Sequence, residues 1–221
     1  MSKVGITWVT SDWHIGHDMM RSKCDRPADF ADRIIRNHRE MIGERDMTIN
    51  LGDLLFYGEA VDTVRDAIHR DSPTRIPGRH VLVLGNHDIK RKSFYYRLGF
   101  DFVCEALVLD RVLYTHHPAR PPIGMLNVHG HWHLPRVELP KGYDRKRQIL
   151  VSMEQSKYRP VNVSKLVGKA LATLTTGEVA LKKPWIDAWA KTDLGGDDEE
   201  NELRSGMERL EEILQTAEGG A

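Results

Sequence analysis

This 221-residue chain has little cysteine and no long apolar run. Its two cysteines, Cys24 and Cys104, exclude a disulfide framework and a zinc site built from cysteine alone. No apolar run approaches the roughly 20 residues that span a bilayer, so no integral membrane protein is expected. Met1 to Lys3 lead straight into a strand-like run with no small-residue cleavage site, so no signal peptide is expected either. These absences favour a cytoplasmic protein.

The chain also lacks a net charge, because 32 lysines and arginines balance 32 aspartates and glutamates. There is therefore no global basic field to attract nucleic acid and no acidic field to attract a basic partner. Charged residues make up 29% and apolar residues 40% of the chain, which is typical of a globular protein with a core. At roughly 150 residues per domain, the length favours one domain with an appendage.

The hydrophobic pattern alternates between strand and helix in the first half of the chain. We expect strands over 4–10, 47–51 and 80–84, with amphipathic helices over 30–42 and 61–68. The second half is mostly strand, with expected runs over 102–109, 111–115, 125–128 and 149–153. This order predicts a mixed α/β sandwich with parallel pairing first and hairpins later.

The last quarter of the chain carries a weaker signal. We expect a main domain over 1–163, a helical extension over 164–194, and an acidic linker with an amphipathic tail helix over 195–221. Within 199–217 four apolar residues form one helical stripe: Leu203, Met207, Leu210 and Leu214. That helix packs on its own domain, frays in solvent, or mediates self-association or a protein contact.

Histidine is abundant, with 11 residues in the chain and five between positions 116 and 133. Each of five strand-like runs ends in candidate metal ligands, which are Asp12, His14, Asp53, Asn86, His116, His131 and His133. Ligand-bearing ends of strands meet at one edge in layered α/β folds. These donors are too many for a single tetrahedral zinc. If one carboxylate bridges, they suit two divalent or trivalent ions such as Mn, Fe, Zn or Ni.

These residues stand in motifs that resemble the signature of the calcineurin-like metallophosphoesterases, in particular the small bacterial and phage members. The motifs are Asp12-x-His14, Gly52-Asp53, Gly85-Asn86-His87-Asp88, His116 and Gly130-His131-x-His133. The resemblance covers about residues 4–163 and implies a four-layer αββα sandwich with a dimetal site at the sheet edge. It implies one metal on Asp12, His14, Asp53 and His133, and a second on Asp53, Asn86, His116 and His131. The choice of His116 over His117 rests on this analogy.

The resemblance implies a phosphodiesterase in which a hydroxide bridging two metals, with manganese as the expected metal, is the nucleophile. His87 would serve as general acid or as a donor to the scissile phosphate. The substrate would be a cyclic nucleotide, a nucleic-acid end or a similar diester. Phe56 stands where the protein Ser/Thr phosphatases of the superfamily have an aspartate, and their arginine is missing, so phosphoprotein substrates are disfavoured.

Two other functions remain open. One is a phosphomonoesterase that acts on a small metabolite or nucleotide. The other is a scaffold that keeps the fold without turnover, which the complete ligand set disfavours.

Several residues near the motifs are candidates for substrate contact. Arg120 follows the His116 loop and His17 follows His14; the alternative for His17, as for His129, is a structural role. Asp88 either orients His87 or caps the next helix. Two basic runs, 90–97 with Tyr95 and Tyr96, and 141–147, either hold a nucleotide or nucleic acid or form solvated faces.

Overall fold

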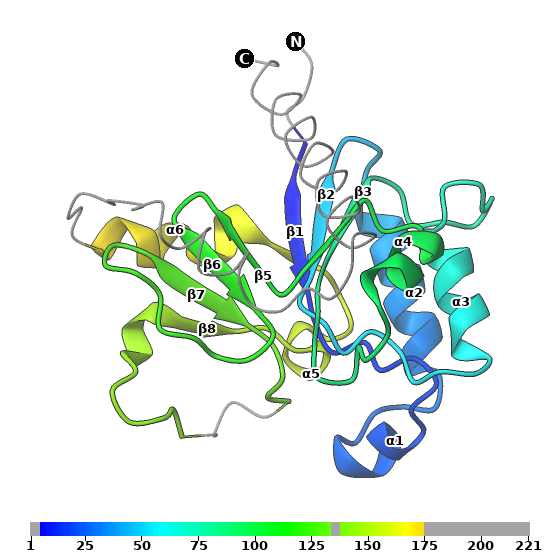
Figure 1. Cartoon of the computed structure of the whole chain (residues 1–221), viewed down its shortest axis with the longest axis horizontal. Helices are drawn as coiled ribbons and strands as arrows, with labels where there is room; N and C mark the ends of the chain where they lie inside the picture. The colour runs from blue at the N-terminus through cyan, green and yellow to red at the C-terminus, as the bar shows by residue number, and fades with distance from the viewer. Residues whose placement is uncertain (1–4, 134–137, 175–221) are drawn as a thin grey trace.

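The strands of this protein form two sheets that lie against each other (Figure 1). The computed structural model describes residues 5–133 and 138–174. The first sheet has the order β4-β3-β2-β1-β9, in which β1 to β4 are parallel and β9 is antiparallel to β1. Its strands are β1 (Thr7–Thr10), β2 (Met47–Asn50), β3 (Arg79–Val83), β4 (Phe102–Cys104) and β9 (Val161–Asn162).

The second sheet has the order β5-β6-β7-β8. Its strands are β5 (Ala106–Leu109), β6 (Val112–Thr115), β7 (Leu126–His129) and β8 (Gln148–Leu150). Asp110 and Arg111 join β5 to β6 in a hairpin, both with the positive φ that a tight two-residue turn needs. The pairs β6–β7 and β7–β8 are parallel. The prediction of hairpins is therefore wrong for these two pairs, whose long connections return the chain so that each strand runs in the same direction.

The apolar pattern predicted a single strand over 102–109, but the structure has two. The segment divides at Glu105, so that β4 pairs with β3 in the first sheet and β5 pairs with β6 in the second. Glu105 is half exposed and forms an ion pair with Lys92 at 2.8 Å. The run expected over 149–153 also divides, because β8 ends at Leu150 and the helix α5 (Met153–Ser156) begins three residues later.

Helices cover the outer face of the first sheet. They are α2 (Phe30–Met41), α3 (Ala60–Ile68) and α4 (Lys92–Leu98), with the short α1 (Met19–Lys23) at one end (Figure 1). In α2 the residues Phe30, Ile34 and His38 recur every four positions and are buried, which explains both the helix and its orientation. The core between these helices and the sheet includes Trp8 and Leu82.

A second core lies between the two sheets. Val9, Ile49 and Val81 of the first sheet share it with Tyr114 and Val128 of the second. The helix α6 (Val163–Thr173) adds to the same core. Two sheets flanked by helices confirm the predicted mixed α/β sandwich.

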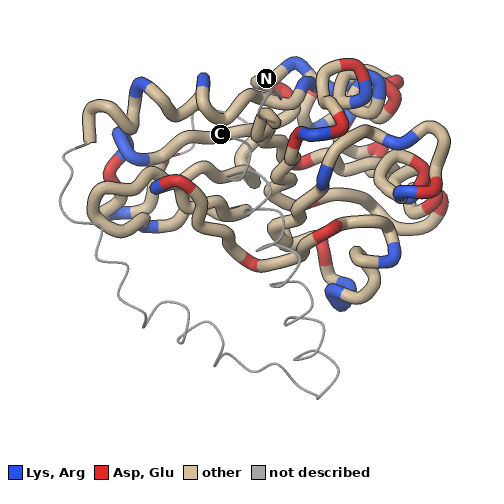
Figure 2. Tube along the Cα trace, turned by 90° about the horizontal axis from the view of Figure 1, so that it is seen from above, with Lys and Arg blue, Asp and Glu red and all other residues tan. Residues whose placement is uncertain are grey.

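The described part of the helical extension over 164–194 is α6, and a 3-10 turn, η1 (Arg145–Arg147), precedes β8. The acidic linker and the tail helix over 199–217 lie outside the described residues. Among the described residues no helix is long and apolar enough to cross a membrane. Basic and acidic residues are interspersed along the chain in Figure 2, in keeping with the zero net charge.

Candidate metal centre

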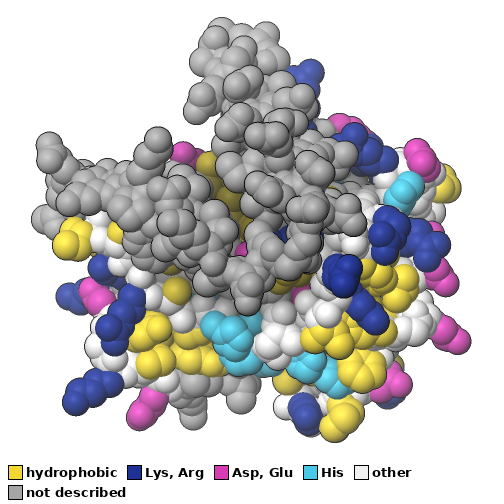
Figure 3. Space-filling view, in the orientation of Figure 1, with side chains coloured by type: hydrophobic (Ala, Val, Ile, Leu, Met, Phe, Trp, Pro, Cys, Tyr) yellow, Lys and Arg dark blue, Asp and Glu magenta, His cyan; other side chains and the backbone are white. Residues whose placement is uncertain are grey.

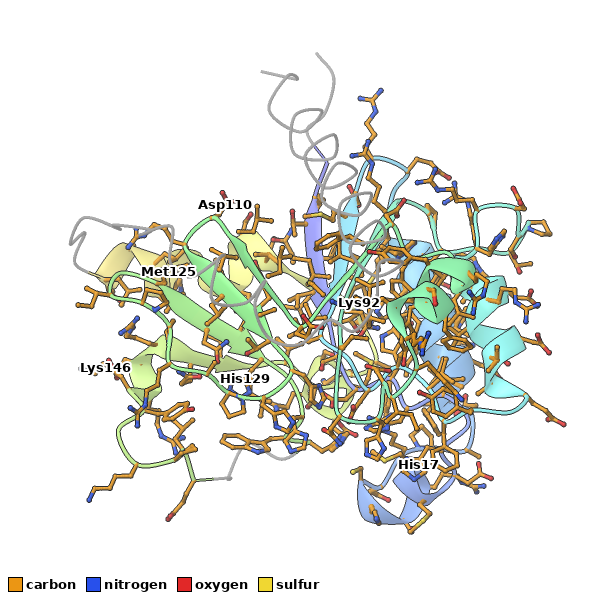
Figure 4. The ribbon with its side chains drawn as sticks, viewed as in Figure 1. His17, Lys92, Asp110, Met125, His129 and Lys146 are labelled. Carbon is orange, nitrogen blue, oxygen red and sulfur yellow. The ribbon has the colours of Figure 1, made fainter. Side chains whose placement is uncertain are left out.

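The loops that follow β1, β2, β3, β6 and β7 meet at one edge of the two sheets. Main-chain bonds join the first two loops, from Asp12 N to Gly52 O and from His14 N to Asp53 O, both at 2.9 Å. A Cβ on Gly52 would lie 2.3 Å from Gly85 N, so only glycine lets these loops approach so closely. Figure 4 shows His17 and His129 near this edge and Asp110 at the opposite end of the sheets.

Four of the candidate ligands have a left-handed backbone. The φ angles are 56° for Asp12, 48° for His14, 53° for Asp53 and 70° for His131. This conformation costs on the order of 1 kcal/mol for a residue with a side chain. Strain of this kind persists where the surrounding structure imposes it, and it concentrates at functional sites.

The side chains of these loops form overlapping clusters that could hold metal ions. In each cluster the ligand atoms lie within 4.8 Å of one another. Three of the clusters are Asp12, His14 and His133; Asp12, Asp53 and His116; and His116, His117 and His131, while Cys24, His133 and Glu154 form a fourth behind them. Oδ2 of Asp53 lies 3.4 Å from Nε2 of His14 and 3.4 Å from Nε2 of His116. Asp53 therefore lies between the two sides of the site, as a bridging carboxylate must.

The hydrogen bonds of His116 prepare it for a cation. Its Nδ1 lies 2.7 Å from the carbonyl oxygen of Leu51, which can only accept, so Nδ1 carries a proton. Its Nε2 faces Oδ1 of Asn86 at 2.9 Å and Nδ1 of His131 at 3.2 Å. An acceptor oxygen facing a ring nitrogen at this distance needs a proton or a metal ion between them. His117 is exposed, and its ring centroid lies 4.0 Å from that of His131.

A buried nitrogen on the other side of the site has no hydrogen bond in the described residues. Nε2 of His14 makes no hydrogen bond within the described residues, although the residue is only 4% exposed. A buried polar atom without a partner is costly unless something binds it. Imidazole, carboxylate and amide donors converging here fit first-row metal ions.

The pKa values of the site suit metal binding at neutral pH. Burial would raise the pKa of Asp53, but the hydrogen bond and charge of His116 and the main-chain N–H of His87 hold it well below its usual range. Burial lowers the pKa of His14 to about 3. Burial raises the pKa of Asp12 to about 6, against the charges of His116 and His133. Burial would lower the pKa of His116, but the hydrogen bond and charge of Asp53 raise it. At pH 7 the site thus presents carboxylates and a neutral His14, the forms that bind metals, and a metal on His116 would displace a proton from that ring.

Asp88 fixes the loop that carries Asp53. Its carboxylate accepts the main-chain N–H groups of Asp53 at 2.8 Å, Leu54 at 3.2 Å and Gly85 at 2.8 Å. It is 6% exposed, and burial raises its pKa to about 6. Asp88 therefore holds together the loops after β2 and β3. The sequence predicted that it would orient His87 or cap the next helix, and these hydrogen bonds do neither.

His87 and His17 lie at the rim of the clusters. The His87 ring centroid lies 5.3 Å from that of His14 and 6.0 Å from that of His17. His17 in turn stacks on Phe56, with centroids 4.7 Å apart and an interplanar angle of 15°. His129 is buried, with Nδ1 at 3.0 Å from Gly130 O. The structure thus brings His17 and His87 together beside the ligands.

Arg120, a candidate for substrate contact, lies against Lys141 and Tyr143. Its Nη2 donates to the Lys141 carbonyl at 2.9 Å and its guanidinium lies 5.2 Å from the Tyr143 ring. Among the described residues, no hydrogen bond or ion pair joins it to the clusters. The interpretation of 90–97 as an aromatic nucleic-acid platform is wrong for Tyr95, which is fully buried against the first core.

Two residues of the site carry no motif and were missed from the sequence. Glu154 has both carboxylate oxygens close to Nδ1 of His133, at 3.1 and 3.2 Å. Arg26 lies 2.7 Å from Glu154 and donates to the carbonyl oxygens of Asp12 and Trp13. No local pattern signals this pair, whose members are 128 positions apart.

Comparisons with known proteins give the fold and the family of the chain. A crystal structure of a protein of unknown function from Aquifex aeolicus is similar in fold, with a TM-score of 0.55 and 19% sequence identity over 75% of this chain and 99% of that one. A search of curated proteins gave no match. The sequence profile of the calcineurin-like phosphoesterases matches residues 7–164. The chain therefore belongs to the calcineurin-like phosphoesterase family.

Proposed function

We propose that the protein hydrolyses phosphodiester bonds with two metal ions at the clustered strand ends. Membership of the family implies a metal-dependent phosphoric ester hydrolase. The observation that carries the proposal is the position of Asp53, with one carboxylate oxygen 3.4 Å from ligand nitrogens on both sides. The first position would use Asp12, His14, Asp53 and His133, and the second would use Asp53, Asn86, His116 and His131.

The ligand types fit manganese, and iron, zinc or nickel are the alternatives. When bound, two such ions would neutralise charge on the phosphate oxygens and lower the pKa of a water aligned with phosphorus. The chain itself orients these ligands through the left-handed backbone of the loops and through the Asp88 hydrogen bonds. Asn86 and the neutral imidazoles keep the site from becoming too anionic to admit a phosphate ester.

His87 is the proposed general acid. Its main-chain N–H donates to Oδ1 of Asp53 at 2.9 Å, which fixes the start of its side chain beside the bridging carboxylate. The residue is exposed, so the imidazole can reach the oxygen that leaves phosphorus. Protonation of that oxygen by a positioned imidazole contributes typically 10²- to 10⁴-fold to the rate.

The rim next to His87 suits an aromatic substituent on the substrate. Phe56 is 51% exposed while one of its faces stacks on His17. Ile89, two residues beyond His87, is 75% exposed. Figure 3 shows histidine side chains at the surface with hydrophobic side chains on either side of them. We assign His17 and Phe56 to contact with a nucleobase or other aromatic group.

The charges near the site favour a diester. A monoester dianion carries one more negative charge than a diester and needs another cation. In the described residues, Arg26 is buried and its donors already bind Asp12, Trp13 and Glu154, while Arg120 binds the Lys141 carbonyl. Neither arginine thus adds a charge at the clusters, and two ions there match the single charge of a diester.

The test compares bis-p-nitrophenyl phosphate with p-nitrophenyl phosphate. The protein is stripped of metal and reconstituted with Mn²⁺, and Asp53→Asn is measured beside the wild type. Manganese-dependent cleavage that favours the diester and is lost in Asp53→Asn supports the proposal. Preference for the monoester assigns a phosphomonoesterase instead, and no cleavage with Mn, Fe, Zn or Ni contradicts catalysis of this kind.

A further inference from the structure

Arg26 and Glu154 form a buried ion pair next to the candidate metal centre. Their side chains are 0% and 15% exposed, and Nε of Arg26 lies 2.7 Å from Oε1 of Glu154. The remaining donors of Arg26 bind the loop that carries two ligands: Nη1 donates to Trp13 O and Nη2 to Asp12 O, both at 2.8 Å. The planar guanidinium therefore links Glu154 to the strained backbone between Asp12 and His14.

Glu154 fixes the ring of His133. Its two oxygens lie 3.1 and 3.2 Å from Nδ1, and a carboxylate only accepts, so Nδ1 carries the proton. Nη2 of Arg26, 3.5 Å from the same nitrogen, is itself a donor and cannot accept that proton. Nε2 is left without a proton and with its lone pair free. A carboxylate behind a histidine ligand in this way fixes its tautomer and the orientation of its ring.

The other side of the site is held differently. The Nδ1 atom of His116 donates to the neutral carbonyl oxygen of Leu51 at 2.7 Å. In the described residues, the side chains of Asn86 and His131, the neighbours of its Nε2, make no hydrogen bond to a carboxylate, although the main-chain N–H of His131 donates to Asp12. In the part of the chain that the structure describes, a charged pair thus orients ligands of the first position, and no such pair supports the side chains of Asn86, His116 and His131.

We propose that the Arg26–Glu154 ion pair positions the ligands Asp12, His14 and His133 and makes the first metal position the tighter of the two. This rests on the proposed two-metal function. Glu154 and Arg26 are positioning residues, because they act through His133 and the Asp12 loop rather than on the substrate. Their effect is therefore measured on metal binding itself.

The experiment is calorimetric titration of the metal-free full chain with Mn²⁺. Glu154→Gln keeps the shape of the side chain and removes its charge. Glu44→Gln is the matched control, because Glu44 makes a 2.7 Å contact to an arginine, Arg75, and precedes β2 at the far end from the site. Arg26→Lys keeps the charge of Arg26 and removes its fork. Thermal denaturation without metal establishes that each variant is folded.

Glu154→Gln is expected to weaken the tighter class of site by about 10- to 100-fold and leave the other class within twofold of wild type. Arg26→Lys is expected to weaken Mn²⁺ binding at the same class of site. If Glu154→Gln does not fold, the Mn²⁺ affinities of Arg26→Lys decide the proposal instead. The proposal is overturned if both classes are unchanged, if both weaken equally, if Glu44→Gln gives the same loss, or if the wild type binds no Mn²⁺. A wild type that binds two ions without cleaving either ester contradicts the proposed function, while the titration still decides the role of the pair.

Discussion

Nε2 of His116 lies 2.9 Å from Oδ1 of Asn86, although the proton of this imidazole is held on the other nitrogen by Leu51. A proton on Nε2, or a metal ion that both atoms bind, satisfies this arrangement. On the other side of Asp53, His14 presents a buried nitrogen without a hydrogen-bond partner in the described residues. Both sides of the site thus carry atoms whose lone pairs a metal ion would bind.

Mn²⁺ is therefore expected to stabilise the protein. At 100 times its Kd, a ligand that binds only the folded state adds about 2.7 kcal/mol to the free energy of unfolding. We expect Mn²⁺ to raise the Tm of the metal-free wild type and to raise that of Asp53→Asn less, because the bridging charge is lost. An equal rise in the two proteins would mean that the ions bind elsewhere.

His87→Ala is expected to lower kcat by roughly 10²-fold or more without loss of bound metal, because it removes a general acid and no ligand. The loss should be larger with diphenyl phosphate than with bis-p-nitrophenyl phosphate, since p-nitrophenolate leaves with less need of a proton. His69→Ala is the control, because His69 is a partly exposed histidine outside the site. Equal losses with the two diesters would show that His87 is not the acid.

Phe56→Ala is expected to weaken the binding of aromatic groups. A single aromatic contact is worth about 1 kcal/mol, so Ki for phenylphosphonate should rise roughly fivefold while Ki for inorganic phosphate stays constant. Val108→Ala changes another exposed apolar residue, 42% exposed on β5, and should alter neither. A parallel rise in both inhibition constants would place Phe56 in the support of the metal centre instead.

The core histidine His38 is expected to make the fold sensitive to acid. It is fully buried between Ile34 O, at 2.7 Å, and Thr10 Oγ1, at 3.1 Å, and burial lowers its pKa to about 3. A lowered pKa means that its contribution to stability is complete above the unfolded value near 6.5 and is lost as pH falls toward 3. At pH 5 the loss is about 2 kcal/mol.

Urea unfolding of the wild type and His38→Gln at pH 7 and pH 5 measures this effect. Glutamine does not titrate, so the variant should lose less stability between the two pH values than the wild type. The comparison cancels the contributions of Asp12 and Asp88, whose raised pKa values act in the opposite direction. An equal loss in the two proteins would assign the acid sensitivity to other groups.

The strand ends and the seven candidate ligands could be located from the sequence because their signals are local. Asp53, for instance, directly follows a glycine that closes a buried strand, and the parallel arrangement brings such ends to one edge. The division at Glu105 could not be predicted, because β4 and β5 are both apolar and differ only in the sheet that they join. Tyr95 was misjudged because a seven-residue helix is too short for its buried face to be read from the pattern.

The supporting residues of the site were beyond local patterns. Arg26 and Glu154 meet across 128 positions; Arg26 lies in the loop between α1 and α2 and Glu154 on the short α5, and neither segment contains a motif. Asp88 was noticed as a neighbour of His87, but its three main-chain partners depend on how the loops after β2 and β3 pack. Such roles follow from tertiary contacts and not from residue spacing.

Anomalous scattering from crystals grown with Mn²⁺ tests the central claim most directly. We expect two peaks about 3.5–4 Å apart, one beside Asp12, His14 and His133 and the other beside Asn86, His116 and His131, with the Asp53 carboxylate between them. A single peak, or peaks that do not share Asp53, would contradict the two-metal centre.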